Sequence, residues 1–425
     1  MSAVLLKIIS PDDVPALRRD PVDAATLAAT SIIVEDVRER GEAAVRHHAL
    51  RLGDIQEGEA LFVGRKELVT ALAGLSEHEH SVLKRTAARI EAFAKAQRAS
   101  VHDIEVAIPG GVAGQQVAPV ERAGCYAPGG RFPLPSSVLM TAITARAAGV
   151  ETVWVASPRP TQITLAAAAL AGADGLLRVG GAQAIAAFAY GLGPMAPCDV
   201  VVGPGNRWVT AAKQIVSGTV RIDMLAGPSE LVVLADHSAQ PGMIAADLLA
   251  QAEHDPDALP ILIATDRALI DAVNAELERQ LAVLPTHETA RAALANGYAV
   301  LVENVSVGVE LCNRLAPEHL ELLVQDARAI VPILRHYGGL FIGAGTAEVF
   351  GDYGAGPNHT LPTGGTARSA GGLSVFDFLR IRTWMRVDDA SAAQELAQDA
   401  ADLGRMEGLE GHARSAEWRL GKGEA

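Results

Sequence analysis

Residues 151–181, ETVWVASPRPTQITLAAAALAGADGLLRVGG, decide the fold class of this chain. The stretch opens with ETVWVAS (151–157), continues with an Ala-rich segment and ends with GLLRVGG (175–181). Short apolar runs that contain β-branched residues and end in Ser, Gly or Pro are typical of strands buried on both faces of a parallel sheet. Two such strands joined by a helix form a βαβ unit, so the stretch predicts an α/β architecture.

The same pattern continues along the chain and then starts again. DVVVGPG (199–205) extends the first set of strands, and a second set follows as ELVVLAD (230–236), LPILIATD (259–266), YAVLVEN (298–304) and GGLFIGAG (338–345). Two successive sets predict two doubly wound sheets with a cleft between them. Because ligands of such sheets bind where strands end, residues directly after strands become candidates for a functional site.

The segments before and after these strands have a helical pattern of apolar residues. Residues 11–98 repeat apolar side chains at helical spacing, and residues 388–420 read as a pair of helical runs. The predicted fold is therefore α/β, with two doubly wound, incomplete Rossmann-like domains, N-terminal helices and a helical C-terminal tail. We place the boundaries as an N-terminal helical region (1–117), an α/β domain with cofactor-binding turns (118–228), a catalytic α/β domain (229–380) and the tail (381–425).

Composition excludes several classes of protein. The chain has 425 residues and a net charge of −14, whereas a nucleic-acid-binding protein normally presents a basic face. No run approaches the roughly 18 apolar residues of a membrane span, so neither nucleic acid nor membrane is expected as a partner. The three cysteines, Cys125, Cys198 and Cys312, are far apart, which favours a reducing cytoplasm over a disulfide framework. Cys125 could be a thiol nucleophile, but a buried structural role is the stronger interpretation.

The stretch LLAQAEHDPDA (248–258) offers a possible metal site. Gln251 and His254 are three residues apart at the end of a helical run, so both would project from one helix face. A helix end capped by a histidine explains the pair equally well, because a metal needs further ligands from elsewhere. The candidates for those ligands are Asp352 and His359 in the long loop GDYGAGPNHTLPTGGTARSAGG (351–372), and His412 in the tail.

A second candidate lies in NRLAPEHLEL (313–322), where Glu318 precedes His319. Pro317 suits the first turn of a helix, so we expect His319 near a helix N-terminus. The helix dipole would disfavour the imidazolium there and keep the ring neutral and able to accept a proton. Glu318 could activate a water molecule. The alternative is an acidic residue at a helix start followed by an exposed histidine.

The turns VGGAQ (179–183) and GPGN (203–206) follow strands and open helices, so their backbone N–H groups could hold phosphate. Neither matches the dinucleotide fingerprint G-x-G-x-x-G. They are compatible with a dinucleotide site and equally with ordinary strand-to-helix turns.

Taken together, these stretches resemble the histidinol dehydrogenase family. The resemblance covers most of residues 118–380 in the family's order, and GLEGH (408–412) in the tail also matches. It is carried by the blocks VERAGCYAPGGRFPLPSSVLMTAITARAAGV, VGGAQAIAAFAYG, VGPGNRWVTAAKQIV, IDMLAGPSELVVLAD, AADLLAQAEHDPDA, NRLAPEHLEL and GDYGAGPNHTLPTGGTAR. It implies a zinc-dependent, NAD-linked enzyme that oxidises L-histidinol to L-histidine in two hydride transfers through a bound aldehyde, as the last step of histidine biosynthesis.

The resemblance also implies roles for individual residues. Glu318 and His319 match the family's catalytic pair, and Tyr126, Gln183 and Asn206 match its NAD contacts. One zinc ion per subunit would be held by Gln251, His254, Asp352 and His412. The substrate pocket would comprise Ser229, Gln251, His254, His319, Glu348, Asp352, His359, Glu407 and His412. Family members are homodimers in which the tail crosses to the partner, so Glu407 and His412 would complete the other subunit's site.

Three alternatives compete with this function. Relatives with the same metal and catalytic pair oxidise other primary alcohols to acids, as sulfopropanediol dehydrogenase does, and RIRTWMRVDD (380–389) is the least family-like segment nearby. A zinc hydrolase could also use Glu318 to activate water, although a hydrolase needs no dinucleotide-binding turns. A binding protein without activity is the third alternative, and the intact set of matching site residues argues against it.

Overall fold

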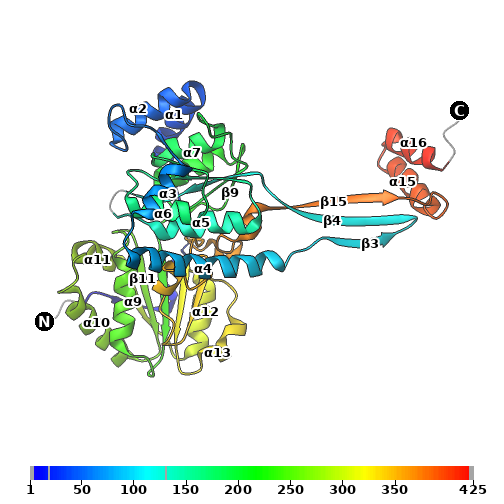
Figure 1. Ribbon diagram of the computed structural model, residues 1–425. Coiled ribbons are helices and arrows are strands. Elements are labelled where there is room, and N and C mark those ends of the chain that lie inside the picture. The colour runs from blue at the N-terminus through cyan, green and yellow to red at the C-terminus, as the bar shows by residue number, and fades with distance from the viewer. Residues whose placement is uncertain (1–3, 18–19, 130–131, 421–425) are drawn as a thin grey trace. The chain divides into compact units, whose positions relative to one another are not determined.

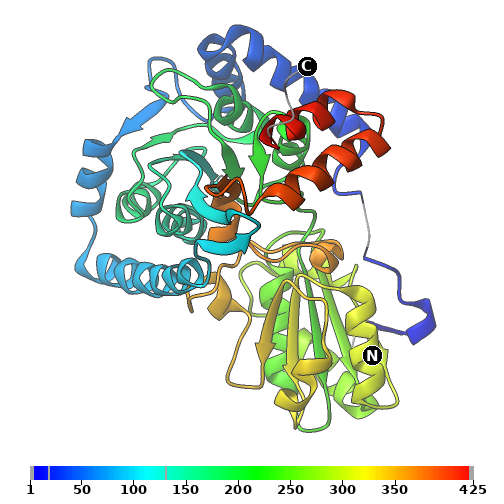
Figure 2. The same cartoon turned by 90° about the vertical axis from the view of Figure 1, so that its right-hand side faces the viewer.

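The computed structural model describes residues 4–17, 20–129 and 132–420. The chain forms two compact units, one made of Met1–Ala96 with Val120–Phe378 and the other of Gln97–Pro119 with Leu379–Ala425. The first unit contains two six-stranded sheets, which Figure 2 shows as separate layers, each flanked by helices. The α/β class predicted from the sequence is thereby confirmed, while the four-part division of the chain stays a prediction.

The first sheet has the strand order β2-β7-β6-β5-β8-β9. All neighbouring pairs are parallel except β2 with β7, which are antiparallel. Its strands are β2 (Phe62–Gly64), β5 (Arg122–Tyr126), β6 (Thr152–Ala156), β7 (Gly175–Leu177), β8 (Val200–Val202) and β9 (Arg221–Ile222). After the edge strand β2, the chain forms β5, adds β6 and β7 on one side of it and then returns to add β8 and β9 on the other. The strand order therefore reverses between β5 and β8.

Helices cover both faces of this sheet (Figure 1). On one face, α7 (Gly181–Tyr190), α8 (Arg207–Val216), α1 (Ala24–Arg40) and α2 (Glu42–Leu52) share a core in which Phe188 is fully buried. On the opposite face, α5 (Pro135–Ala148) and α6 (Gln162–Leu170) pack against β5, β6 and β7. The remaining N-terminal helices are α3 (Arg65–Ala73), which packs on α6, and α4 (Glu77–Ala99). The predicted helical character of residues 11–98 is largely confirmed, apart from the short β2.

The second sheet has the order β1-β12-β11-β10-β13-β14, and all its pairs are parallel. Its strands are β1 (Lys7–Ile9), β10 (Glu230–Ala235), β11 (Leu259–Ala264), β12 (Tyr298–Leu301), β13 (His319–Leu323) and β14 (Gly339–Ile342). One face packs against α9 (Pro241–Ala252), α10 (Arg267–Leu281) and α11 (His287–Leu294), and the other against α12 (Val305–Leu315) and α13 (Ala327–Ile330). In this sheet the order reverses between β10 and β13.

All seven strands predicted from the sequence are present, but the helix expected after Pro317 is not. Residues His319–Leu323 instead form the strand β13, and all five are buried. Helix α12 ends before Pro317, because Ala316 takes a left-handed φ of 53° and its N–H bonds back to Cys312. A proline directly after a helix C-terminus cannot continue the helix, so Pro317 here follows one helix and does not start another.

The second unit is a three-stranded antiparallel sheet with two helices. Its strand order is β15-β4-β3, with β3 (Ile104–Ile108), β4 (Gly111–Pro119) and β15 (Leu379–Val387). The helices α15 (Gln394–Met406) and α16 (Glu410–Arg419) pack on one another, as the sequence predicts for the tail. Across the described ranges of the whole chain, no helix combines the length and the apolar character that crossing a membrane requires.

The remaining elements are short. Helix α14 (Val349–Asp352) lies in the segment after β14, and single 3-10 turns occur as η1 (Pro11–Asp13), η2 (Val331–Ile333), η3 (Thr366–Arg368) and η4 (Val375–Phe378).

The close contact between β5 and α7 gives a test of the first sheet. A Cβ added at Gly124 would lie 2.5 Å from the Phe188 ring, so Gly124→Ala must displace a fully buried side chain. We expect the variant to lose about 1–3 kcal/mol of unfolding free energy, measured by urea denaturation. Gly218→Ala is the matched control, because nothing lies within 4 Å of its Cβ position. Equal stability of the two variants would contradict this packing.

Candidate active site

Four of the predicted site residues lie where the strand order reverses, but at opposite ends of the strands in the two sheets. In the first sheet, Tyr126 ends β5 and Asn206 follows β8, so both lie at the carboxyl edge. In the second sheet, Ser229 precedes β10 and Glu318 precedes β13, so both lie at the amino edge. The predicted site residues named here thus follow their strands in the first sheet and precede them in the second, and their functional roles stay predictions.

Glu318 and Glu230 hold each other at the amino ends of β13 and β10. The Glu318 carboxylate accepts from the Glu230 N–H at 3.1 Å, and the Glu230 carboxylate accepts from the Glu318 N–H at 3.1 Å. The Ser229 hydroxyl also donates to Glu318. Burial, together with the nearby charge of Glu230, raises the pKa of Glu318 well above its usual range. Glu318 is thus a fixed, buried carboxyl group whose affinity for protons is increased.

The first residue of β13, His319, is a buried and neutral imidazole. Its Nδ1 lies 3.0 Å from the Glu230 carbonyl oxygen, which can only accept, so Nδ1 carries the proton and Nε2 presents a lone pair. Burial, assisted by the positive charge of His359, lowers the pKa of His319 to about 3. The ring is therefore neutral as predicted, but the predicted reason is wrong: it lies on a strand, and desolvation replaces the helix dipole as the cause.

His359 and Glu348 extend this cluster from the segment after β14. The His359 Nε2 lies 2.9 Å from the His319 Nε2 and 2.8 Å from a carboxylate oxygen of Glu348. Burial, the largest single effect, would raise the pKa of Glu348, but the hydrogen bond from His359 and the positive charges of the neighbouring histidines together outweigh it and lower that pKa to about 2. Desolvation is also the largest single effect at His359 and would lower its pKa, but the same hydrogen bond and the negative charges of Asp352 and Glu348 together raise it. The pair is therefore an ionised carboxylate facing a basic imidazole.

Gln251, His254 and Asp352 form a set of potential metal ligands beside that cluster. Gln251 lies in the last turn of α9 and is 1% exposed, yet neither its amide oxygen nor its amide nitrogen has a hydrogen-bond partner. The His254 Nε2 lies 3.6 Å from an Asp352 carboxylate oxygen, and the other Asp352 oxygen lies 3.7 Å from His359. A buried amide without a partner is costly, so the set fits a cation that would use the Gln251 oxygen.

A second group could also hold a metal ion. One ligand atom each from His319, Glu348 and His359 lie within 4.8 Å of one another. In this group the His319 Nε2, the His359 Nε2 and one Glu348 oxygen are within hydrogen-bond distance of one another, whereas the other Glu348 oxygen, like the Gln251 amide, is buried without a partner. The described residues therefore offer two candidate sets of metal ligands, each with a buried polar atom that a cation could satisfy.

The carboxyl edge of the first sheet holds the predicted cofactor contacts. The Tyr126 hydroxyl accepts from the Gly181 N–H at 3.2 Å, and the Gln183 amide donates to Asp54 at 3.4 Å. Asp54 also accepts from the Gly180 N–H at 2.9 Å. These N–H groups at the start of α7 therefore have partners within the chain. These bonds suit the alternative of an ordinary strand-to-helix turn, and a phosphate held by the VGGAQ turn stays a prediction.

Asn206 caps the neighbouring helix α8. Its side-chain oxygen accepts from the N–H groups of Trp208 and Val209 at 3.0 and 3.3 Å. Asn206 itself is exposed at this edge. Tyr126, Gln183 and Asn206 thus lie along one edge of one sheet, although their role toward NAD stays a prediction.

Glu407 and His412 belong to the second unit. Glu407 follows the last turn of α15, His412 lies in the first turns of α16, and both are exposed. Their part in the site stays a prediction.

Two acidic residues of this region were not singled out from the sequence. Glu230 begins β10 and is 3% exposed; Glu321 lies on β13 and is 1% exposed. Burial raises the pKa of Glu321 to about 9, assisted by the nearby carboxyl of Asp247 on α9. The sequence signal that could have identified both is a charged residue inside a short apolar run, as in ELVVLAD and HLELL. If such a run is a central strand, its charged residue is buried.

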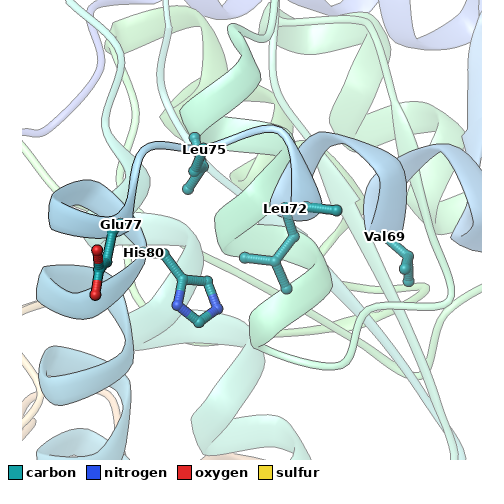
Figure 3. A pocket seen from close by; sticks show the side chains of 6 residues that line it. Val69, Leu72, Leu75, Glu77 and His80 are labelled. Carbon is teal, nitrogen blue, oxygen red and sulfur yellow. The ribbon is translucent and has the colours of Figure 1, made fainter.

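Two other features lie apart from this chemistry. A surface pocket of about 470 Å³ opens between α3 and α4, lined by Val69, Leu72, Ala73, Leu75, Glu77 and His80 (Figure 3). No predicted site residue lines it. Cys125 is fully buried, and burial raises the pKa of its thiol to about 12, which supports a structural role and not a nucleophilic one.

Comparisons with known proteins agree with this arrangement. The sequence profile described as histidinol dehydrogenase matches residues 17–420. The chain is 47% identical to the histidinol dehydrogenase of Thermus thermophilus over 91% of this chain and 93% of that protein. It is 44% identical to the enzyme of Aromatoleum aromaticum over 94% and 92%. The crystal structure of histidinol dehydrogenase from Elizabethkingia anophelis superposes with a TM-score of 0.91 at 30% identity, covering 98% of each chain. The chain therefore belongs to the histidinol dehydrogenase family of oxidoreductases.

Proposed function

We propose that this chain oxidises L-histidinol to L-histidine in two successive steps through L-histidinal, passing one hydride in each step to a molecule of NAD⁺. The observation that carries the proposal is the pair Glu318–His319, a buried carboxyl group of raised pKa beside a neutral imidazole of fixed tautomer. Alcohol oxidation needs a base for the hydroxyl proton, and aldehyde oxidation also needs a base for water. In the pair, His319 would be the base for the hydroxyl proton and Glu318 the base for water.

In the first step the His319 Nε2 takes the hydroxyl proton as hydride leaves the adjacent carbon. The imidazole is suited to this because burial keeps it neutral and Glu230 holds the proton on its Nδ1. In the second step Glu318 removes a proton from the water that adds to the aldehyde, and His319 again takes the hydroxyl proton of the hydrate. Each step yields one NADH, and water supplies the second carboxylate oxygen of the product.

A zinc ion held by Gln251, His254 and Asp352, with His412 from a partner subunit, fits the nitrogen and oxygen donors at the site and the unsatisfied amide of Gln251. Zinc carries out no redox chemistry, so it would anchor the imidazole and amine of the substrate for both steps. Ser229, Glu348, His359 and Glu407 would surround the substrate.

We propose that NAD binds at the carboxyl edge of the first sheet, where Tyr126, Gln183 and Asn206 lie. The position agrees with the general rule that nucleotides bind where strand order reverses, here between β5 and β8. The amides at the start of α7 are already bonded to Asp54 and Tyr126, so the pyrophosphate would contact a different part of this edge.

We further propose a homodimer in which the second unit serves the partner's site. This unit exposes several large apolar side chains, among them Met385 at 78%, Met406 at 82% and Trp418 at 64%. Apolar side chains gathered on a small unit are typical of an interface. The placement of a small-molecule biosynthetic enzyme in the cytoplasm is part of the same proposal.

Replacing Glu318 by Gln should affect the two steps unequally. We expect oxidation of supplied L-histidinal to fall by about 10²–10⁴-fold, the contribution typical of a general base, and oxidation of L-histidinol to L-histidinal to fall far less. Because the pKa of Glu318 is raised, the parent's aldehyde step should quicken as pH rises and the carboxyl group loses its proton, and the variant should lose that dependence. Single-turnover formation of NADH measures both steps, with Glu310→Gln on the exposed face of α12 as control. An unchanged aldehyde step would remove Glu318 as the water base.

Zinc content separates the two possible metal sites. We expect His319→Asn to slow both steps while its zinc content, measured by atomic absorption, stays at the parent's level. Gln251→Ala and His254→Ala should each lose zinc, because they lack a ligand. His237→Ala, at an exposed histidine after β10, is the control. Loss of zinc from His319→Asn with retention in the other two would move the metal to the cluster of His319, Glu348 and His359.

A shared active site predicts complementation between inactive variants. His412→Ala and His254→Ala chains should each be inactive as homodimers. After subunit exchange, a heterodimer would carry both lesions at one site and none at the other, so up to about one intact site per heterodimer should return by the symmetry of the pair. NADH formation by purified, differently tagged heterodimers measures this. Heterodimers as inactive as both parents would show that the tail serves its own subunit.

A further inference from the structure

The first sheet contains a buried ion pair, Lys213–Asp223, that the proposed chemistry does not use. Lys213 lies in α8 and its side chain is 3% exposed; Asp223 follows β9 and its side chain is 0% exposed, and the ammonium and carboxylate are in direct contact. Taking two charges out of water costs about as much as their attraction returns, so a buried pair is weak evidence for stability. Its presence needs another reason.

Each member of the pair also makes a hydrogen bond to the backbone of Gly203. The Lys213 ammonium donates to the Gly203 carbonyl oxygen at 3.0 Å, and the Gly203 N–H donates to Asp223 at 2.8 Å. Asp223 also accepts from the Met224 N–H at 2.7 Å. The ion pair therefore holds the N–H and the C=O of one peptide residue at the same time.

Gly203 has an unusual backbone conformation and lies very close to a neighbouring strand. Its φ is +118°, a conformation that residues with a side chain rarely adopt, and a Cβ there would lie 2.0 Å from the Tyr126 carbonyl oxygen. It is the first residue after β8 and stands three residues before Asn206. Gly203 thus lies at the end of β8, against Tyr126 at the end of the neighbouring strand β5. The chain continues from Gly203 to Asn206.

Asp223 also lies at the start of the segment that connects the first sheet to the second. Asp223 begins the segment that runs to Ser229, and the Thr210 hydroxyl on α8 donates to the Ala226 carbonyl of this segment at 2.8 Å. The Gly227 N–H in turn donates to Thr363 at 2.6 Å. Through these bonds the same helix that carries Lys213 is tied to the segment that ends at the catalytic edge.

We propose that Lys213 and Asp223 are positioning residues, which fix the turn Gly203–Asn206 in the place where the nicotinamide dinucleotide binds. The inference rests on the proposed function. A direct role of Lys213 toward a phosphate does not fit, because its charge is buried and neutralised by Asp223. The pair acts instead through the backbone of Gly203, and so it governs binding of the dinucleotide and not of the alcohol.

The test removes both charges together, because removing one would leave the other buried and unpaired. In Lys213→Met/Asp223→Leu both groups become apolar at nearly the same volume, a change that is often neutral for stability. We expect the Kd for NAD⁺, measured by isothermal titration calorimetry, to rise at least roughly tenfold, the scale seen when a group that orients a ligand-binding residue is removed. The Kd for L-histidinol, the zinc content and the thermal midpoint should stay near the parent's values.

Two further variants make the result decisive. Gly203→Ala displaces the same turn while keeping both charges, so it should weaken NAD⁺ binding with the same selectivity, and combining it with the double variant should add little. Arg146→Met/Asp174→Leu removes another ion pair of the same sheet, formed at 2.7 Å with side chains 27% and 32% exposed, and should leave NAD⁺ binding unchanged.

The outcomes distinguish the inference from the proposed function. A parent chain that does not bind NAD⁺ would overturn both. If the parent binds NAD⁺ and the Lys213/Asp223 double variant binds it as tightly, only the inference fails. Equal weakening in the Arg146/Asp174 control would mean general loosening of the sheet and would overturn it too. Should the double variant not fold, Gly203→Ala decides: unchanged NAD⁺ binding rejects the inference, and selective loss supports it.

Discussion

The parallel pairing of β10 with β13 is the constraint on which the proposed catalytic site depends. It sets Leu231 opposite His319, and so brings Glu230 and Glu318 together at the ends of neighbouring strands. Two buried carboxyl groups would be strongly destabilising without partners, but each accepts the other's backbone N–H. The same register directs the Glu230 carbonyl to the His319 Nδ1, so the strand pairing also selects the tautomer of the imidazole.

In both sheets, predicted site residues lie where the strand order reverses, but at the carboxyl edge of the first sheet and the amino edge of the second. At the carboxyl edge of the first sheet, residues that follow β5 and β8 form the proposed cofactor contacts, which agrees with the general rule for open α/β sheets. At the amino edge of the second sheet, residues at the starts of β10 and β13 form the proposed catalytic group. The chain passes from one edge to the other through the segment from Asp223 to Ser229, so the positions of the two edges are linked by a few residues.

Burial alone does not determine the protonation of this site, because neighbours decide how each group responds to it. Desolvation raises the pKa of Glu318, whereas at Glu348 the hydrogen bond from His359 and the charges of nearby histidines together outweigh desolvation and lower the pKa to about 2. His319 and His359 divide in the same way, one with a lowered and one with a raised pKa. The two carboxyl groups thus differ in charge state, and so do the two imidazoles. A single site can therefore contain both a neutral base and permanently charged groups.

The sequence by itself determined the α/β class, seven of the strands, the helical tail and, through the family resemblance, the residues that the structure gathers at the two edges. These follow from local signals, because a buried parallel strand is a short apolar run and a motif keeps its residues in order. Other features depended on tertiary structure. The segment after Pro317 contains both a helix signal and a strand signal, and only its place between β10 and β14 made it a strand. The neutrality of His319, the roles of Glu230, Lys213 and Asp223, and the occupation of the α7 N-terminus by Asp54 depend on partners distant in the chain. Burial and charge are set by those partners, and no local pattern encodes them.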